Sequence, residues 1–216
     1  MQLLKIYLKY KAKKNNYKLP NDWTDALNKH IVTPDGFNAK IKFTTNLTMI
    51  NLLTMQLRRN NKILISADWA YELLFADSDI ENNFRIVLGH ELAHTKKDNA
   101  FLLKLPKSKT DKKFLHWVDE VFADFYGTQI MGESSRFKLE KTIKNTIKYK
   151  FGKSKNNARP SLKDTNTHPS WNRRLFYSQK YNFNECLIKK IASDTKCDNE
   201  KLINKALEYY GTIILE

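Results

Sequence analysis

Two of the five histidines in this chain lie four residues apart, within residues 85–98, which read RIVLGHELAHTKKD. On a helix this spacing places His90 and His94 on one face, one turn apart. Both imidazoles can then bind one ion at the distance of about 2.0–2.1 Å that zinc requires. Glu91 is rotated around the helix and can reach a water on the ion, as the general base of a metal-assisted hydrolysis must. A buried helix that carries two hydrogen-bonded histidines is the alternative interpretation.

A zinc site that is open to chemistry needs a third protein ligand and a free position for water. The pattern HExxHxxGxxH would supply a third histidine, but Lys97 and Ala100 stand at its Gly and His positions. A carboxylate on a second helix is the other source of a ligand. Residues 117–132, WVDEVFADFYGTQIMG, are the candidate segment.

Glu120 and Asp124 lie four residues apart in that segment, on one face of the expected helix. Glu120 is the expected zinc ligand. Asp124 is expected to accept the remaining ring N–H of His90, because metal-bound histidines usually have such a partner. Aromatic and apolar neighbours indicate a largely buried helix, where carboxylates need cations or donors. His116, one turn before Glu120, is the competing candidate for the third ligand.

A third element, residues 167–176, reads THPSWNRRLF. His168 directly precedes Pro169, which we expect at the first position of a helix, where proline is preorganised. A histidine held there can donate to a developing oxyanion, and an arginine behind it, Arg173 or Arg174, can orient carboxylates or substrate. The alternative is an ordinary helix start with basic surface residues.

The charge balance is strongly basic: 38 Lys and Arg against 23 Asp and Glu give a net charge of +15. Such a balance suggests an acidic partner, namely nucleic acid, an anionic membrane or an acidic protein, although lysines scattered over a solvated surface produce the same number. Lysines interrupt the apolar residues near the N-terminus, so we expect no signal peptide. An amphipathic surface-binding helix over residues 3–14 stays open. No apolar run approaches the roughly 20 residues of a spanning helix.

The chain contains two cysteines, Cys186 and Cys197, and no CxxC pair. Such a pair in a chain of this length does not make a disulfide framework. We therefore expect a soluble protein of a reducing compartment, with the cytoplasm as its location.

Helix-period patterns dominate, and Gly and Pro are few, so we expect a predominantly helical α+β protein with a small sheet of two to four strands. Residues 46–59 are ambiguous, and a helix capped by Asn46 is preferred. Residues 184–209 are expected as one helical stretch. The other expected elements are a short helix capped by Asn21 or Asp22, strands at 39–45 and 61–66, helices at 67–75, from 77–79 onward, at 110–131 and at 135–151, a loop at 152–167 and a helix at roughly 169–181.

Together, HELAH, EVFAD and THPSWNRR resemble the gluzincin zinc metallopeptidases. The closest pattern is that of the HtpX-like and CAAX-protease-like group, in which HExxH, ExxxD and HPxxxxR occur in this order. The resemblance spans roughly residues 60–180. Membrane members of that group carry transmembrane helices, which we do not expect here. The lack of such helices and the short spacing between His94 and Glu120 resemble soluble intracellular relatives, such as the phage-exclusion peptidase Lit or the ImmA/IrrE-type peptidases. The His-Pro element argues against the ImmA/IrrE type.

The resemblance implies a zincin-like fold with an HExxH active-site helix and a second helix for the third ligand. It implies one metallopeptidase domain over residues 1–216, with helical additions at 1–40 and 182–216. The strand within 61–66, NKILIS, would be the sheet edge along which an extended peptide pairs its backbone. The implied site consists of Zn²⁺ bound by His90, His94 and Glu120, Glu91 as catalytic base, Asp124 as the partner of a ligand, and His168 with Arg174 stabilising the transition state.

Two functions follow from these residues. The first is a soluble zinc endopeptidase that hydrolyses peptide bonds of an intracellular protein, in stress response or phage defence. The second is a basic nucleic-acid- or partner-binding protein with a structural or vestigial zinc site. A peptidase whose basic surface docks an acidic substrate or nucleic acid is the intermediate case.

Overall fold

The structure is a computed structural model that describes residues 2–45, 55–58, 60–75, 78–96, 108–132, 139–144 and 163–214. The chain divides into two compact units, Met1–Thr95 and Lys96–Glu216. Most of the described residues are helical and one small sheet is present, which confirms the expected α+β class. None of the described helices is both long and apolar enough to span a bilayer. The zincin-like arrangement and the single domain stay predictions.

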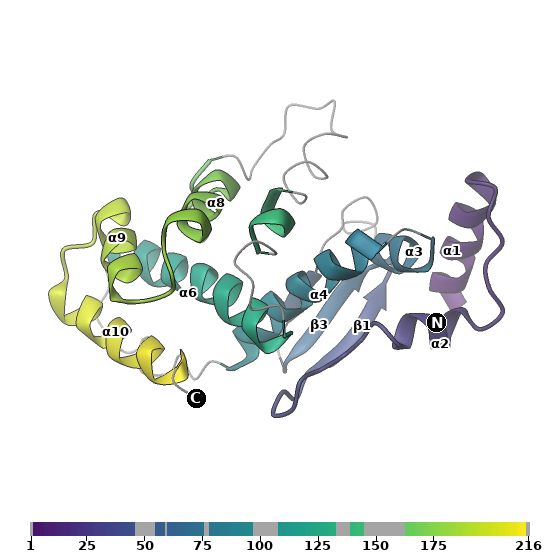
Figure 1. Ribbon diagram of the computed structural model, residues 1–216, viewed down its shortest axis with the longest axis horizontal. Helices are drawn as coiled ribbons and strands as arrows, with labels where there is room; N and C mark the ends of the chain where they lie inside the picture. The colour runs from purple at the N-terminus through teal and green to yellow at the C-terminus, as the bar shows by residue number, and fades with distance from the viewer. Residues whose placement is uncertain are drawn as a thin grey trace. The chain divides into compact units, whose positions relative to one another are not determined.

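The first unit contains a three-stranded sheet in the order β1-β3-β2, of which Figure 1 labels β1 and β3. Strand β1 (Lys40–Thr44) runs parallel to β3 (Lys62–Ser66), and β2 (Met55–Arg58) pairs antiparallel with β3. Ile63 and Ile65 are fully buried. Because side chains two apart in a strand point to the same side, these two isoleucines define the face of β3 that meets the core.

Two expectations about this sheet are wrong. Residues 55–58 form a strand, not part of a helix over 46–59; residues 46–54, with the expected cap Asn46, lie outside the described residues. Asn60 and Asn61 both have a positive φ, 59° and 51°. Asparagine tolerates this conformation in turns, and here the chain turns back from β2 into β3. β3 is therefore the central strand, bonded on both sides, and cannot be a free edge for a peptide.

The helices described in the first unit are α1 (Gln2–Lys14), α2 (Trp23–Asn28), α3 (Ala67–Phe75) and α4 (Ser78–Ala93). Helix α3 has the predicted bounds and follows β3 without a loop. Asp22, one of the two predicted caps, is the N-cap of α2, although its side chain makes no capping hydrogen bond. One hydrophobic cluster joins α1, α2 and α3.

The second unit is helical where it is described, with α6 (Lys109–Ile130), α8 (Trp171–Lys180), α9 (Glu185–Thr195), α10 (Glu200–Ile214) and a helical segment at 139–144 (Figure 1). Helix α6 packs against α8, α9 and α10. Its residues Phe114, Trp117 and Val121 recur at helical spacing and are buried in the core of this unit. The remainder of the helix expected at 135–151, and most of the loop expected at 152–167, lie outside the described residues.

The single helix expected at 184–209 is two helices. Lys196 adopts a left-handed conformation (φ 58°), and the N–H of Cys197 donates to the carbonyl of Ala192 at 2.9 Å, which is a common way for a helix to end. The side chain of Asn199 then accepts a backbone N–H from the first turn of α10 at 3.2 Å. The spacing of apolar residues in the sequence does not indicate such a break, because the break depends on the backbone conformation of a single residue.

Asp111 ties the start of α6 to the turn between α9 and α10. It forms a capping box with Ser108, and its carboxylate also lies 3.4 Å from the Cys197 Sγ and 3.2 Å from the Asn199 Nδ2. Burial alone would raise the pKa of Asp111, but the hydrogen bonds that the carboxylate accepts outweigh burial and lower that pKa. Burial raises the pKa of the Cys197 thiol to about 11.

Candidate metal centre

Helix α4 carries the HELAH segment and is oriented by its apolar residues. Phe84, Leu88 and Leu92 recur at every fourth position and are fully buried. Trp69 of α3 packs edge-on against Phe84, with the ring centroids 5.5 Å apart. This packing decides which side of α4 meets the core of the first unit, and it leaves the side chain of His90 half-buried beside that face.

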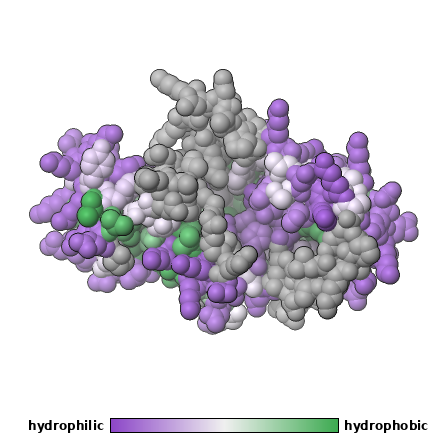
Figure 2. Space-filling view, turned by 180° about the vertical axis from the view of Figure 1, so that it is seen from behind, coloured by the Kyte–Doolittle hydropathy of each residue, from purple (hydrophilic) through white to green (hydrophobic). Residues whose placement is uncertain are grey.

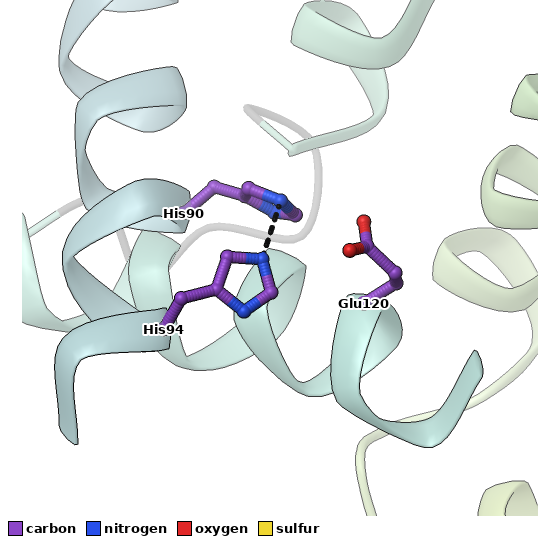
Figure 3. Close-up of side chains that lie close together, drawn as sticks. All are labelled: His90, His94 and Glu120. Carbon is purple, nitrogen blue, oxygen red and sulfur yellow. Dashed lines mark hydrogen bonds between the residues drawn. The ribbon is translucent and has the colours of Figure 1, made fainter. Parts of the chain in front are cut away.

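The two histidines converge. Nε2 of His90 lies 3.1 Å from Nε2 of His94, and the rings are nearly perpendicular, with centroids 4.7 Å apart (Figure 3). Two nitrogens that bind one zinc tetrahedrally, at about 2.0–2.1 Å each, are about 3.3 Å apart. The observed separation therefore fits a shared ion. Binding through both Nε2 atoms requires that each ring carries its proton on Nδ1.

The local backbone contributes to this convergence. Helix α4 ends at Ala93, and His94 opens a 3₁₀ turn, η1 (His94–Lys96). A 3₁₀ turn has fewer residues per turn than an α-helix, and the hydroxyl of Thr95 donates to the carbonyl of Leu92 at 2.7 Å. The sequence predicted the four-residue spacing but not this change of helix type.

Glu91 lies in α4 next to His90 and is half-buried. Successive side chains leave an α-helix about 100° apart, so Glu91 and His90 point in different directions from the helix axis. This agrees with the expectation that Glu91 is not a ligand. Its role as general base stays a prediction.

In the second unit, Arg174 of α8 binds the predicted carboxylates of α6. Its Nε donates to Oδ2 of Asp124 at 2.7 Å, and its Nη2 bonds to Oδ1, so the pair is bidentate. Nη1 lies 4.0 Å from Oε2 of Glu120, and the guanidinium stacks over the Trp171 ring at 4.1 Å. All three charged side chains are largely buried. Of the two roles expected for this arginine, the contacts favour the orientation of carboxylates.

Arg173, the neighbouring arginine, has different partners. Its Nε donates to Oδ2 of Asp164 at 2.9 Å, and its Nη1 lies 3.2 Å from Oδ2 of Asp194. Asp164 also accepts the backbone N–H of Ser170 at 2.9 Å. Burial alone would raise the pKa of Asp164, but the bonds from Arg173 and Ser170 outweigh it and lower that pKa. Asp164 is not among the residues predicted from the sequence, although its position shortly before the serine N-cap of α8 was a usable signal.

His168 lies beside Glu120. Its Nε2 is 3.4 Å from Oε1 of Glu120, and its Nδ1 is 2.8 Å from the Thr167 hydroxyl. One expectation here is wrong: α8 begins at Trp171 with Ser170 as its N-cap, so Pro169 precedes the cap and is not the first helical residue. The side chain of His168 is 58% exposed, and its role as a donor to an oxyanion stays a prediction.

A short turn holds His168 against α6. The backbone N–H of His168 donates to the Thr165 hydroxyl at 2.8 Å, and the N–H of Thr165 donates to the carbonyl of His168 at 2.9 Å. The fully buried indole of Trp117 donates to the carbonyl of Thr165 at 2.9 Å. The threonine and the tryptophan are positioning residues that the sequence did not reveal, because the bond joins residues far apart in the chain.

Among the residues that the structure describes, the candidate metal ligands are His90 and His94 in the first unit and Glu120 in the second (Figure 3). Two imidazoles and one carboxylate are a ligand set of catalytic zinc sites. His116, the competing candidate, is exposed and is not part of this group. The histidines belong to the first unit and Glu120 to the second, so their joint action is part of the proposal below.

No family model, no curated protein and no solved structure matches this chain. The gluzincin resemblance therefore depends on the HELAH, EVFAD and THPSWNRR segments, and it stays a prediction.

Proposed function

We propose that this chain is a zinc-dependent endopeptidase that hydrolyses peptide bonds of an intracellular protein. The main support is the convergence of the Nε2 atoms of His90 and His94, which lie 3.1 Å apart. In the proposal Glu120 is the third ligand, which completes a set of two histidines and one carboxylate with a further position for water.

The chemistry divides between the ion and the side chains. When bound, zinc supplies Lewis acidity, which polarises a carbonyl and lowers the pKa of a water molecule. Glu91 is proposed to accept the proton of the attacking water and to deliver it to the leaving amine. His168 is proposed to donate to the developing oxyanion. Arg174, which binds Asp124 and lies near Glu120, is proposed to position these carboxylates.

An intracellular substrate is proposed because Cys186 and Cys197 are both free thiols, as is usual in reducing compartments. The alternative function, a basic binding protein with a structural zinc site, makes a different prediction. It requires salt-sensitive binding to nucleic acid and no activity that a chelator removes.

The test compares the zinc-loaded wild type with Glu91→Gln on a library of peptides from digested cellular proteins, with new N-termini identified by mass spectrometry. The variant should keep its zinc and lose cleavage by about 100-fold or more, because general acid–base groups contribute at least that much. Glu81→Gln is the matched control, since Glu81 is an exposed glutamate of the same helix, 3.2 Å from His30.

Undiminished cleavage by Glu91→Gln would contradict the role of Glu91. An absence of any zinc-dependent new N-terminus with the wild type would overturn the proposed peptidase activity.

A further inference from the structure

Helix α1 presents two faces, one of which belongs to the core of the first unit. Its residues Leu4, Leu8 and Ala12 are buried at every fourth position, and the two leucines pack in a cluster with Ala67 and Ala70 of α3. The opposite side of α1 consequently faces away from this core.

The rotation of α1 about its axis is set by an ion pair. Asp68 of α3, only 8% exposed, accepts hydrogen bonds from the Tyr7 hydroxyl and from the Lys11 Nζ, the latter at 2.9 Å. The Lys11 ammonium also lies 5.5 Å from the centroid of the Tyr71 ring. These contacts hold one defined side of the helix outward.

That outward side is apolar in its centre. Leu3, Ile6 and Tyr10, spaced at i, i+3 and i+7, are 70%, 58% and 65% exposed, and they form the α1 stripe. Figure 2 shows a mostly hydrophilic described surface with small hydrophobic patches. Tyr17, just after α1, is also exposed. Four of the six large hydrophobic side chains that are exposed among the described residues thus lie within residues 3–17, so this concentration is not an even scatter.

Lysines flank the α1 stripe. Lys5, Lys9, Lys13 and Lys14 are all exposed, and residues 1–21 contain no aspartate or glutamate. A lysine side chain can keep its charge in water while its methylene groups lie along an apolar surface. The α1 stripe and its lysines together have the pattern of an interfacial helix, with leucine, isoleucine and tyrosine on one side and lysines beside them.

We propose that α1 binds the surface of an anionic lipid bilayer, with its axis in the membrane plane, the α1 stripe at the boundary of headgroups and acyl chains, and the lysines against lipid phosphates. The helix has 13 residues, fewer than the roughly 20 that cross a bilayer. Nucleic acid would use the lysines but would gain little from three exposed apolar side chains. A lipid surface uses both, and the binding is reversible because the apolar area is small. This inference does not depend on a metal.

The test is sedimentation of the full chain with vesicles of phosphatidylcholine alone, and with vesicles of phosphatidylcholine and phosphatidylserine at a ratio of about 2:1, in low and high salt. The wild type should pellet with the anionic vesicles at low salt. The triple variant Leu3→Ser/Ile6→Ser/Tyr10→Ser should bind them at least about 10-fold more weakly, because it loses the inserted apolar area.

A charge-reversal variant distinguishes binding through the lysines of α1 from binding through the net charge of the whole chain. Lys5→Glu/Lys9→Glu/Lys13→Glu should abolish binding. The matched control reverses three exposed lysines of the second unit, with the same change in net charge, and should bind like the wild type. That control is Lys112→Glu/Lys180→Glu/Lys201→Glu.

Equal losses in both charge variants, or full binding by the serine variant, would show that net charge alone is responsible and would overturn the proposal. Pelleting with neither vesicle, or binding only to a DNA duplex in a parallel assay, would overturn it as well. Because all of these side chains are exposed, circular dichroism should report the wild-type helix content in every variant.

Discussion

The Nε2 atoms of His90 and His94 meet at 3.1 Å, at the junction of α4 and η1. Without an ion, one ring must donate its Nε2 proton to the other ring, which requires two different tautomers. If the proposed ion were bound, both Nε2 atoms would hold it through their lone pairs and neither would carry a proton. The distance therefore fits both a hydrogen bond between the two rings and the ion proposed above, and metal analysis distinguishes the two.

His94→Ala should remove the metal. The wild-type chain, purified without a chelator, is expected to carry about one zinc. The variant should bind zinc more than about 100-fold more weakly, which is more than the loss of affinity caused by removing a residue that only hydrogen-bonds to a metal ligand. Metal analysis of the dialysed proteins and a zinc titration with a competing chelator measure both quantities. His116→Ala is the control, since this exposed histidine should leave the zinc content unchanged.

Glu120→Gln tests the third ligand separately from the histidine pair. If Glu120 binds the ion, the variant should show a weaker zinc affinity in the same titration, because a neutral amide replaces a carboxylate. An unchanged affinity in this variant, with the loss in His94→Ala retained, would restrict the metal site to the first unit.

Arg174→Ala should destabilise the second unit strongly. The side chains of Arg174 and Asp124 are only 8% and 7% exposed, and the variant leaves a buried carboxylate without its bidentate partner. Such a loss lowers the free energy of unfolding by about 3–5 kcal/mol. Arg173→Ala is the matched control, because Arg173 is 32% exposed and the loss should be about 1 kcal/mol or less.

Urea unfolding followed by tryptophan fluorescence measures both arginine variants, since Trp117 and Trp171 lie in the second unit. Similar losses in the two variants would contradict the dominance of the buried pair. The double variant Arg174→Met/Asp124→Leu should recover much of the stability, because a buried ion pair replaced by apolar residues costs little.

Asp111→Asn should change the acid sensitivity of the second unit. The pKa of Asp111 in the folded chain lies below its usual value. Its charged form therefore stabilises the fold at pH values above the pKa of the unfolded chain, which is about 3.9. This contribution is lost as the pH falls through the folded pKa. The difference in unfolding free energy between wild type and variant should therefore be constant from neutral pH to about pH 5 and shrink below about pH 4.

Thermal unfolding at a series of pH values measures this difference. Asp198→Asn is the control, because Asp198 is an exposed neighbour in the same turn. The difference in unfolding free energy between wild type and Asp111→Asn could instead stay constant at pH values well below the usual pKa. That result would contradict a stabilising charged form of Asp111.

The sequence by itself determined the local elements and the spacing of the candidate site. The bounds of α3, the start of α4 and the extent of α6 followed from apolar period and caps, since these signals lie within a few residues of one another. The pairing of His90 with His94 followed for the same reason, because a helix brings residues four apart onto one face. The position of Glu120 one turn before Asp124 was readable in the same way.

Only the tertiary structure decided which distant residues meet. Residues 55–58 are a strand because β3 lies beside them, and β3 is central because two strands pair with it; neither partner is visible in a local window. Arg173 and Arg174 are adjacent in the chain, yet the first binds Asp164 and the second binds Asp124. Strand ladders and buried ion pairs join residues far apart in sequence, and their energies come from contacts that form only in the folded chain.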